Sequence, residues 1–251
     1  MSALSAELLK IRTVRSMPWT LALTALIAAG LGLLVGNGFR DAEPDPEHFD
    51  ATFAAFYGLS LAQLALVVFA VLAVTGEYGS GTIRPSLAAV PRRGAFYLAK
   101  LAAIALWATG TAAVTALAAF GAAQAGLGPR HTALTAAGVP ATVVGAFLYL
   151  VLIALYAAGL AQVFRSSTVT LAVLMPLLFL GSQGLGNVPG LKRVTQFLPD
   201  QAGAAMLHFF GAPGTARYDR GFGPWTGLGI MALWTAAALV AGYLTLRRRD
   251  A

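Results

Sequence analysis

The stretch VTGEYGSGTIRPSLAAVPRRGAFYLAK, from Val74 to Lys100, lies between two long apolar runs. Glycines, prolines, one acid and four basic residues interrupt sequence there that is otherwise apolar enough for a membrane. The run Phe53–Val74 enters the stretch and the run Leu101–Ala125 leaves it, so both of its ends are held at the same membrane face. This position predicts a cytoplasmic loop that transmits movement to the membrane part of the chain.

Composition indicates a membrane protein. Of the 251 residues, 58% are hydrophobic and only 11% are charged, whereas soluble domains hold about 45–50% apolar and about 25% charged residues. A helix needs about 20 apolar residues to cross a bilayer core, and several runs reach that length. The absence of cysteine excludes disulfides, thiolate metal sites and a cysteine nucleophile.

The apolar runs predict an all-α membrane protein with six transmembrane helices in a single transmembrane domain, 1–251. In chain order the predicted spans are 17–37, 53–75, 96–125, 139–164, 168–185 and 224–246. Residues 1–16 place Leu4, Leu8 and Ile11 on one helix face and basic residues on another, which predicts an amphipathic helix on the membrane surface. Residues 76–95 form the predicted cytoplasmic loop.

The longest predicted segment without a span is 186–223. It contains two short amphipathic stretches, Leu191–Leu198 and Gln201–Phe210, which are separated at Pro199. Neither stretch is long enough to cross a bilayer. They either dip into the outer leaflet as a helical hairpin or lie flat on it.

The distribution of basic residues predicts the orientation of the chain, because cytoplasmic loops carry an excess of Lys and Arg. With the N-terminus inside, eleven basic residues fall in inner segments and six in outer segments. The inner ones are Lys10, Arg12, Arg15, Arg84, Arg92, Arg93, Lys100, Arg165, Arg247, Arg248 and Arg249. Both termini are therefore predicted to be cytoplasmic, and the formal net charge of +7 reflects topology and not a nucleic-acid partner.

Sequence motifs for enzymatic chemistry are missing. No G-x-x-x-x-G-K-[ST] motif occurs, so the chain has no P-loop. Ser80 has a serine-protease-like context, but all three histidines fall on the predicted outer side, opposite Ser80, so no serine–histidine pair forms. The acidic loop around His48 fits no metal-ligand spacing. We therefore expect no catalytic residue and no metal site.

Polar residues inside the predicted spans are almost all neutral. An ion-coupled carrier normally keeps ionisable groups inside its spans. Because such groups are nearly absent here, transport driven by a partner protein is favoured over transport driven by an ion gradient. The candidates for a substrate pathway are Ser60, Gln63, Thr109, Tyr149 and Tyr156. Helix–helix hydrogen bonding is the alternative role for each of them.

The loop itself predicts a short helix that ends near Val90 and begins either after the cap residue Thr82 or at Ser86, since Pro85 restrains the residue before it. On such a helix Ile83, Leu87 and Val90 share one face, and this apolar ridge suits a groove in a soluble partner. An ordinary positive-inside loop is the alternative.

Two charged residues flank that predicted helix. Glu77 lies where the second span ends, and it is expected to pair with Arg84 or with a base of the inner leaflet, or else only to cap a helix end. Lys100 is expected to extend its ammonium group out of the third span toward water.

The same loop resembles the E-Y-x-x-G-T-[IL]-[RK]…P-x-[RS]-R…K pattern of ABC-2 type transporter permeases. The matching residues are Glu77, Tyr78, Gly81, Thr82, Ile83, Arg84, Pro91, Arg92, Arg93 and Lys100. The start of the chain, Glu7–Ser16, is similar to the amphipathic entry helix of bacterial members. The six predicted spans, both termini inside and a long outer segment before the last span also resemble that family.

The resemblance implies a permease that works with a second copy or a paralogue and with two copies of a separate ATP-binding subunit, in the plasma (inner) membrane. It implies that the loop holds the coupling helix, that the N-terminal helix braces it, and that 186–223 supplies short re-entrant helices. Spacing and resemblance together assign coupling to Glu77, Tyr78, Gly81, Thr82, Ile83, Arg84, Leu87, Val90, Arg92 and Arg93.

The resemblance further implies that this chain binds no cofactor, because ATP and Mg belong to the partner subunit, and that membrane lipid surrounds it. Since no large extracellular domain is predicted, a small amphiphile, drug or lipid is the expected substrate. A non-enzymatic multi-pass membrane scaffold or immunity protein is the alternative function.

Overall fold

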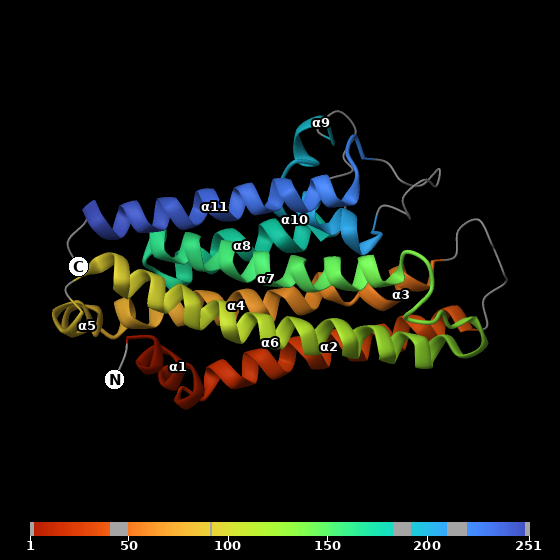
Figure 1. Cartoon of the computed structure of the whole chain (residues 1–251), viewed down its shortest axis with the longest axis horizontal. Coiled ribbons are helices and arrows are strands. Elements are labelled where there is room, and N and C mark those ends of the chain that lie inside the picture. Colours follow the sequence, from red (N-terminus) through yellow and green to blue (C-terminus); the bar gives the residue numbers. More distant parts are fainter. Residues whose placement is uncertain (1–2, 41–49, 91, 183–191, 210–219, 249–251) are drawn as a thin grey trace.

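The computed structural model describes residues 3–40, 50–90, 92–182, 192–209 and 220–248. In these ranges the regular structure is entirely helical (Figure 1). The elements are α1 (Ala3–Thr13), α2 (Ser16–Arg40), α3 (Ala51–Phe56), α4 (Leu59–Gly79), α5 (Ile83–Ala89), α6 (Arg93–Leu127), η1 (Gly128–Arg130), α7 (Val139–Phe164), α8 (Ser167–Ser182), α9 (Lys192–Thr195), α10 (Pro199–Gly203), η3 (Ala204–Leu207) and α11 (Pro224–Arg248).

Five helical segments in the described ranges are long and apolar enough to cross a membrane. They are α2, the nearly continuous pair α3–α4, α6 with η1, α7 and α11. The predicted fifth span corresponds to α8, which has 16 residues and a length of about 24 Å, less than the roughly 30 Å of a bilayer core. The end of that predicted span, 183–185, lies outside the described residues. Five of the six predicted spans therefore meet the length criterion.

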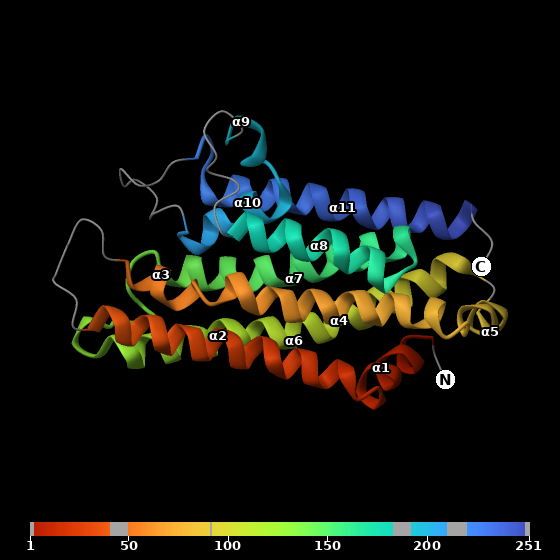
Figure 2. The ribbon, with the colours of Figure 1, turned by 180° about the vertical axis from the view of Figure 1, so that it is seen from behind.

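The long helices form one elongated bundle with α4 in its interior (Figures 1 and 2). α4 packs against α2, α7 and α8, and Leu66, Phe69 and Ala70 are completely buried. A helix that is apolar on every side is stable only when neighbours or lipid cover it. α4 is the helix that the others cover, which is why the bundle is organised around it.

α2 and α6 make the closest helix pair, because small residues line their contact. A Cβ atom on Gly126 would lie 2.6 Å from the carbonyl oxygen of Leu33, and one on Gly32 would lie 2.9 Å from that of Ala119. Real Cβ atoms do not approach so closely, so these two positions need glycine. Such small-residue interfaces let helix backbones pack tightly in membranes.

The two ends of the bundle differ. α1, α5 and the C-terminal end of α11 lie together at one end, while α3, η1 and α9 lie at the opposite end (Figures 1 and 2). We call the first the α5 end. The described chain starts and stops at the α5 end, so the helices that run the length of the bundle leave both termini on one side.

The segment between α8 and α11 packs into the bundle. Pro199 lies between α9 and the rest of this segment and occupies the first position of α10, where its missing N–H costs no hydrogen bond. All residues of α10 and η3 are buried, and they pack against α7 and α11. Gly203 permits this contact, since a Cβ there would lie 2.6 Å from the ring of Tyr149.

Candidate functional site

The chain turns sharply between α4 and α5 at the α5 end. Gly81 has a φ of 71°, a conformation that glycine adopts without a steric penalty. Ser80 Oγ donates a hydrogen bond to the carbonyl of Gly76 at 2.8 Å and lies 2.8 Å from Thr82 Oγ1. Ser80 and Thr82 thus stabilise the turn.

The predicted short helix is present as α5. It begins at Ile83 with Thr82 as its N-cap residue, not at Ser86, and the side chain of Thr82 makes no capping hydrogen bond. Pro85 is accommodated because it lies in the first turn, where backbone N–H groups have no intrahelical partner. Of the two starts that the sequence left open, the structure has the earlier one.

The apolar face of α5 points toward its own chain. Ile83 is only 5% exposed and packs in a small cluster with Phe96, Tyr97 and Leu246. Leu87 and Val90 are half-buried against the same cluster. The apolar ridge therefore packs at least partly against α6 and α11, and its contact with a partner subunit stays a prediction.

The opposite face of α5 is exposed. It presents Arg84, Pro85, Ala88 and Ala89, and Arg92 is exposed just beyond the helix. This face is flat and basic, with small side chains at its centre. If α5 contacts another protein, this is the face that does so.

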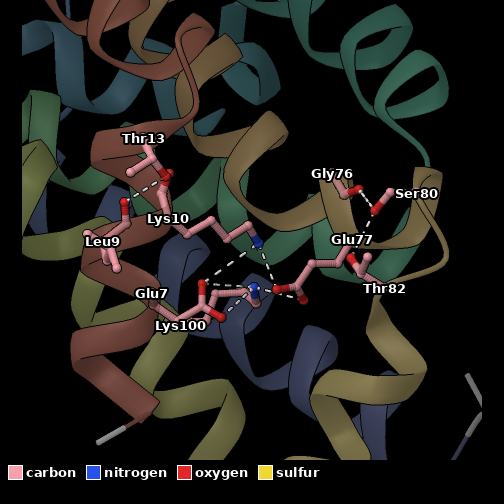
Figure 3. A network of polar contacts seen from close by, with 9 residues as sticks. All are labelled: Glu7, Leu9, Lys10, Thr13, Gly76, Glu77, Ser80, Thr82 and Lys100. Atoms are coloured by element: carbon pink, nitrogen blue, oxygen red, sulfur yellow. Dashed lines mark hydrogen bonds and ion pairs between the residues drawn. The ribbon is translucent and has the colours of Figure 1, made fainter. Parts of the chain in front are cut away.

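A buried ion-pair network, which we call the α1–α4–α6 network, lies beneath α5 and consists of Glu7, Lys10, Glu77 and Lys100 (Figure 3). Lys10 Nζ lies 2.7 Å from Glu77 Oε1, and Lys100 Nζ lies 3.0 Å from Glu77 Oε2 and 3.1 Å from Glu7 Oε2. Two acids and two bases balance each other, so the network is neutral.

The positions of Lys100 and Glu77 in this network can be compared with what the sequence predicted for them. Lys100 does not extend to water, since it is 1% exposed. Its ammonium group lies between the carboxylates of Glu7 and Glu77, and 5.1 Å from the ring centroid of Phe96. Glu77 pairs with inner bases, one of the expected alternatives, and Glu7 was not recognised as a partner at all.

Tyr78 joins the end of α4 to the end of α7. Its hydroxyl accepts a hydrogen bond from Gln162 Nε2, and the guanidinium of Arg165 lies 5.3 Å from its ring centroid, a distance at which cations are attracted to aromatic faces. Arg165 also donates to the carbonyl of Thr245 near the end of α11 at 3.0 Å. Two neighbouring residues, Glu77 and Tyr78, therefore connect α4 to four other helices directly or through one side chain.

Arg93, a predicted coupling residue, contacts α11. Its Nη1 donates to the carbonyl oxygens of Leu246 at 2.9 Å and Arg247 at 3.0 Å. The last carbonyls of a helix lack intrahelical donors and carry partial negative charge. The guanidinium of Arg93 supplies the missing donors and a compensating positive charge. It holds α11 to the start of α6.

Most of the candidate pathway residues come together between α4 and α7. Ser60, Gln63, Tyr149 and Tyr156 are all buried. The hydroxyl of Tyr149 donates to Gln63 Oε1, and Gln63 Nε2 donates to the carbonyl of Ser60. Thr109 differs, since it is exposed on α6. The bond between Tyr149 and Gln63 joins α7 to α4, while the bond from Gln63 to Ser60 lies within α4, and a pathway role for these residues stays a prediction.

A buried acid, Asp200, which the sequence analysis did not single out, borders this group. Asp200 is 2% exposed, and its Oδ1 has no hydrogen-bond partner in the described part of the chain. Burial raises the pKa of Asp200 to about 6, although hydrogen bonds from Gln201 oppose the rise. Tyr149 and Tyr156 both lie within electrostatic range of this carboxyl. The signal that was available is the Pro-Asp pair, which marks a helix start.

His208 joins three elements at the end opposite α5. Its Nδ1 lies 2.6 Å from Asp50 Oδ2 and 2.8 Å from Thr52 Oγ1, and its Nε2 lies 3.2 Å from Thr142 Oγ1. Burial raises the pKa of Asp50, but the hydrogen bonds from His208 and Thr52 outweigh it and lower the pKa to about 2. The pairing fixes the segment after α10 to α3 and α7.

No group of three or more potential metal ligands occurs among the residues that the structure describes. A bundle of long apolar helices, with a short helix and an ionic network at one end, defines a multi-pass membrane protein. The family model for the ABC-2 family transporter protein matches residues 3–181, which is well over half of the chain. The chain belongs to that family, as its loop motif predicted. None of the curated proteins compared with it matches.

Family membership fixes the class of the protein. The matched region runs from α1 into α8 and includes the turn, α5 and the α1–α4–α6 network. Permeases of this kind are membrane subunits and not catalytic ATPases.

Proposed function

We propose that this chain is the membrane-spanning permease subunit of an ATP-binding cassette exporter in the plasma membrane. Two copies of a separate subunit would hydrolyse ATP with Mg, and a second copy of this chain or a paralogue would complete the membrane part. The observation that carries the proposal is α5, an anchored helix with an exposed basic face, within a chain of this family.

Anchoring makes α5 suitable for coupling. Its buried face packs against Phe96 and Tyr97 at the start of α6 and against Leu246 near the end of α11. A force applied to Arg84 or Ala88 on the exposed face would therefore act on two long helices at once. The ATP-binding subunit is proposed to contact this exposed face.

The α1–α4–α6 network supports transmission at the same end. Since Glu77 pairs with Lys10 of α1 and with Lys100 of α6, displacement of either helix separates charges inside a region with little water. Breaking a buried ion pair is strongly unfavourable, so the three helices are expected to move together. This gives α1 the bracing role that the family resemblance implies.

We propose that the α5 end faces the cytoplasm, because Arg84, Arg92, Arg93, Arg247 and Arg248 all lie there and positive residues accumulate on that side of a membrane. The opposite end then faces outward. α10 and η3 would be the re-entrant elements, since they are buried against the spanning helices.

A small amphiphile, drug or lipid is the proposed cargo. The interior polar groups Ser60, Gln63, Tyr149 and Tyr156 offer hydrogen bonds without net charge, which suits a molecule that is mostly apolar. They line the contact between α4 and α7, and a route would open there only when the helices move.

The test is a gentle detergent pull-down of the tagged chain from its native membrane, assayed for ATP hydrolysis. Ala88→Arg places a bulky cation at the centre of the exposed face of α5, and Ala133→Arg makes the same change at an exposed position before α7. We expect the wild type and Ala133→Arg to retain about one ATPase per permease and Ala88→Arg to lose it. A chain that recovers no ATPase in any form would instead support the scaffold alternative.

A further inference from the structure

A groove runs along the outside of the bundle where α1, α2 and α6 meet. It consists of two adjoining hollows of about 450 and 420 Å³ that share Leu106 and Trp107 of α6. The first hollow lies under α1, and the second continues between α2 and α6. Figure 1 shows α1 turning away from the line of α2 beside α6. We call the two hollows together the α1–α6 groove.

Small residues keep the second hollow open. Ala22 and Ala25 of α2 face Gly110 of α6 across it, and a Cβ atom on Gly110 would meet no other atom within 4 Å. The remaining lining is mainly apolar, from residues such as Leu21 and Val114. Thr111 and Trp107 each contribute one polar group to this hollow, but most of its lining is apolar and has the chemistry of an acyl-chain site.

The first hollow differs because it ends at a cation. Arg12 lines it together with Leu8 and Leu9 of α1. Arg12 is exposed, and it makes no hydrogen bond or ion pair with any residue in the described ranges. A cation at the mouth of an apolar groove is the arrangement that an anionic amphiphile complements.

The nearest acids do not compensate Arg12. Helical periodicity places positions 8 and 12 on one face of α1 and positions 7 and 10 on roughly the opposite face. Glu7 is held there by Lys100 and Lys10, and Glu77 is held by the same two lysines. The charge of Arg12 is thus directed outward, toward the level where lipid headgroups lie in the proposed orientation.

We propose that the α1–α6 groove binds an anionic phospholipid, with the phosphate at Arg12 and one acyl chain between α2 and α6. The lipid would hold the outer face of α1 against α6, while the ionic network holds its inner face. This inference rests on the proposed membrane placement of the chain and not on the ATPase partner. The lipid site can therefore be disproved without disproving ATPase coupling, and ATPase coupling can be disproved without disproving the lipid site.

Trp107 lines both hollows and provides a probe inside the site. The chain has four tryptophans, so replacing Trp19, Trp225 and Trp234 with Phe leaves Trp107 as the single fluorophore. This variant would be reconstituted in phosphatidylcholine vesicles that contain increasing fractions of brominated phosphatidylglycerol or brominated phosphatidylcholine. Bromine quenches tryptophan only on contact.

We expect brominated phosphatidylglycerol to reach half-maximal quenching at about a fivefold lower mole fraction than brominated phosphatidylcholine, as one interfacial Lys or Arg contributes to anionic-lipid attraction. Arg12→Gln should remove this preference. Arg92→Gln, an exposed arginine that does not line the groove, should retain it. Gly110→Leu, which fills open space, should reduce quenching by both lipids.

Equal quenching by the two brominated lipids in the single-tryptophan protein would overturn the proposal. So would a preference that persists in Arg12→Gln, since the cation would then lie elsewhere. If Gly110→Leu does not insert into vesicles, Ala22→Leu tests the same hollow from α2, and unchanged quenching in that variant would also count against the site.

Discussion

The ammonium nitrogen of Lys100 lies 3.0 Å from a carboxylate oxygen of Glu77, and both side chains are almost completely buried. The pair joins α6 to α4 at the end of the bundle where α5 packs. A charge in such a place is maintained only by its partners, because desolvation of an isolated ion is very unfavourable. The stability of this end of the bundle therefore depends on the pair remaining intact.

Removing one partner of the pair leaves the other charge buried with less compensation. Lys100→Met leaves Glu7 and Glu77 with reduced compensation, and we expect the free energy of unfolding to fall by about 3–5 kcal/mol. Lys100→Met combined with Glu77→Gln should lose less than the sum of the single changes. Denaturant unfolding in detergent micelles measures the free energy of unfolding of Lys100→Met, of Glu77→Gln and of the double variant.

Arg92→Gln is the control for these variants, because Arg92 is exposed at the same end and such changes usually stay within about 0.5 kcal/mol. Additive losses in the double variant would show that Glu77 and Lys100 do not interact energetically.

Asp200 should make stability increase toward acidic pH. Its pKa is about 6 in the folded chain, above its ordinary value of 3.8, so the folded state binds the extra proton. Stability should rise as the pH falls from about 7 to about 4, by up to roughly 3 kcal/mol. Asp200→Asn should be more stable than the wild type at pH 8 and should lack this rise in thermal unfolding. A rise of the same size in Asp200→Asn would assign it to another group.

Asp50 should act in the opposite direction. Its pKa is lowered from 3.8 to about 2, so its contribution is complete above about pH 4 and is lost as the pH falls toward 2. Asp50→Asn should therefore reduce the free energy of unfolding by about 2 kcal/mol at pH 7 and have little effect at pH 2. Thermal unfolding at the two pH values measures the difference, and a loss that is the same at pH 2 and pH 7 would contradict this assignment.

His208 is the main hydrogen-bond partner of Asp50, so His208→Gln should reproduce part of that loss. The matched control is His131→Gln, because His131 is exposed in the loop before α7. Equal effects of the two histidine changes would show that the contact between His208 and Asp50 contributes no stability.

Two glycines of α6 should respond in opposite ways to the same substitution. Gly126→Ala forces a Cβ to within 2.6 Å of a carbonyl of α2, while a Cβ on Gly121 meets nothing within 4 Å. We expect Gly126→Ala to lower the melting temperature, and Gly121→Ala to leave it unchanged or raise it, because Ala is favoured over Gly in helices by up to about 1 kcal/mol. If Gly126→Ala and Gly121→Ala had the same melting temperature, the close contact between α2 and α6 at Gly126 would contribute no stability.

The sequence predicted the family and the features that depend on local pattern. Long apolar runs identify candidate membrane-spanning helices because a bilayer requires a minimum length, and five such helices occur among the residues that the structure describes. The loop motif identified the family directly. The structure describes 16 residues of α8, Pro176 among them, and the sixth span stays a prediction.

Features that depend on distant partners were missed. Glu7 and Lys100 are 93 residues apart, so no local pattern indicates their pairing. The apolar face of α5 was recognised, but its packing against α6 and α11 was not, because periodicity shows that a face is buried and not what buries it. Asp200 was treated as one of several loop acids, because burial of 199–207 depends on glycine contacts with α7 and α11.

The glycine contacts between α2 and α6 have a mechanical consequence. α6 has 35 residues and is about 52 Å long, and it starts beside α5 and ends beside η1. The contacts lie at one end of the pair, because Gly32 and Gly36 of α2 pack against residues 119–127 of α6, whereas a hollow separates the same helices around Gly110. Motion that reaches the last turns of α6 is therefore expected to carry α2 with it, while the two helices are less tightly joined nearer the α5 end.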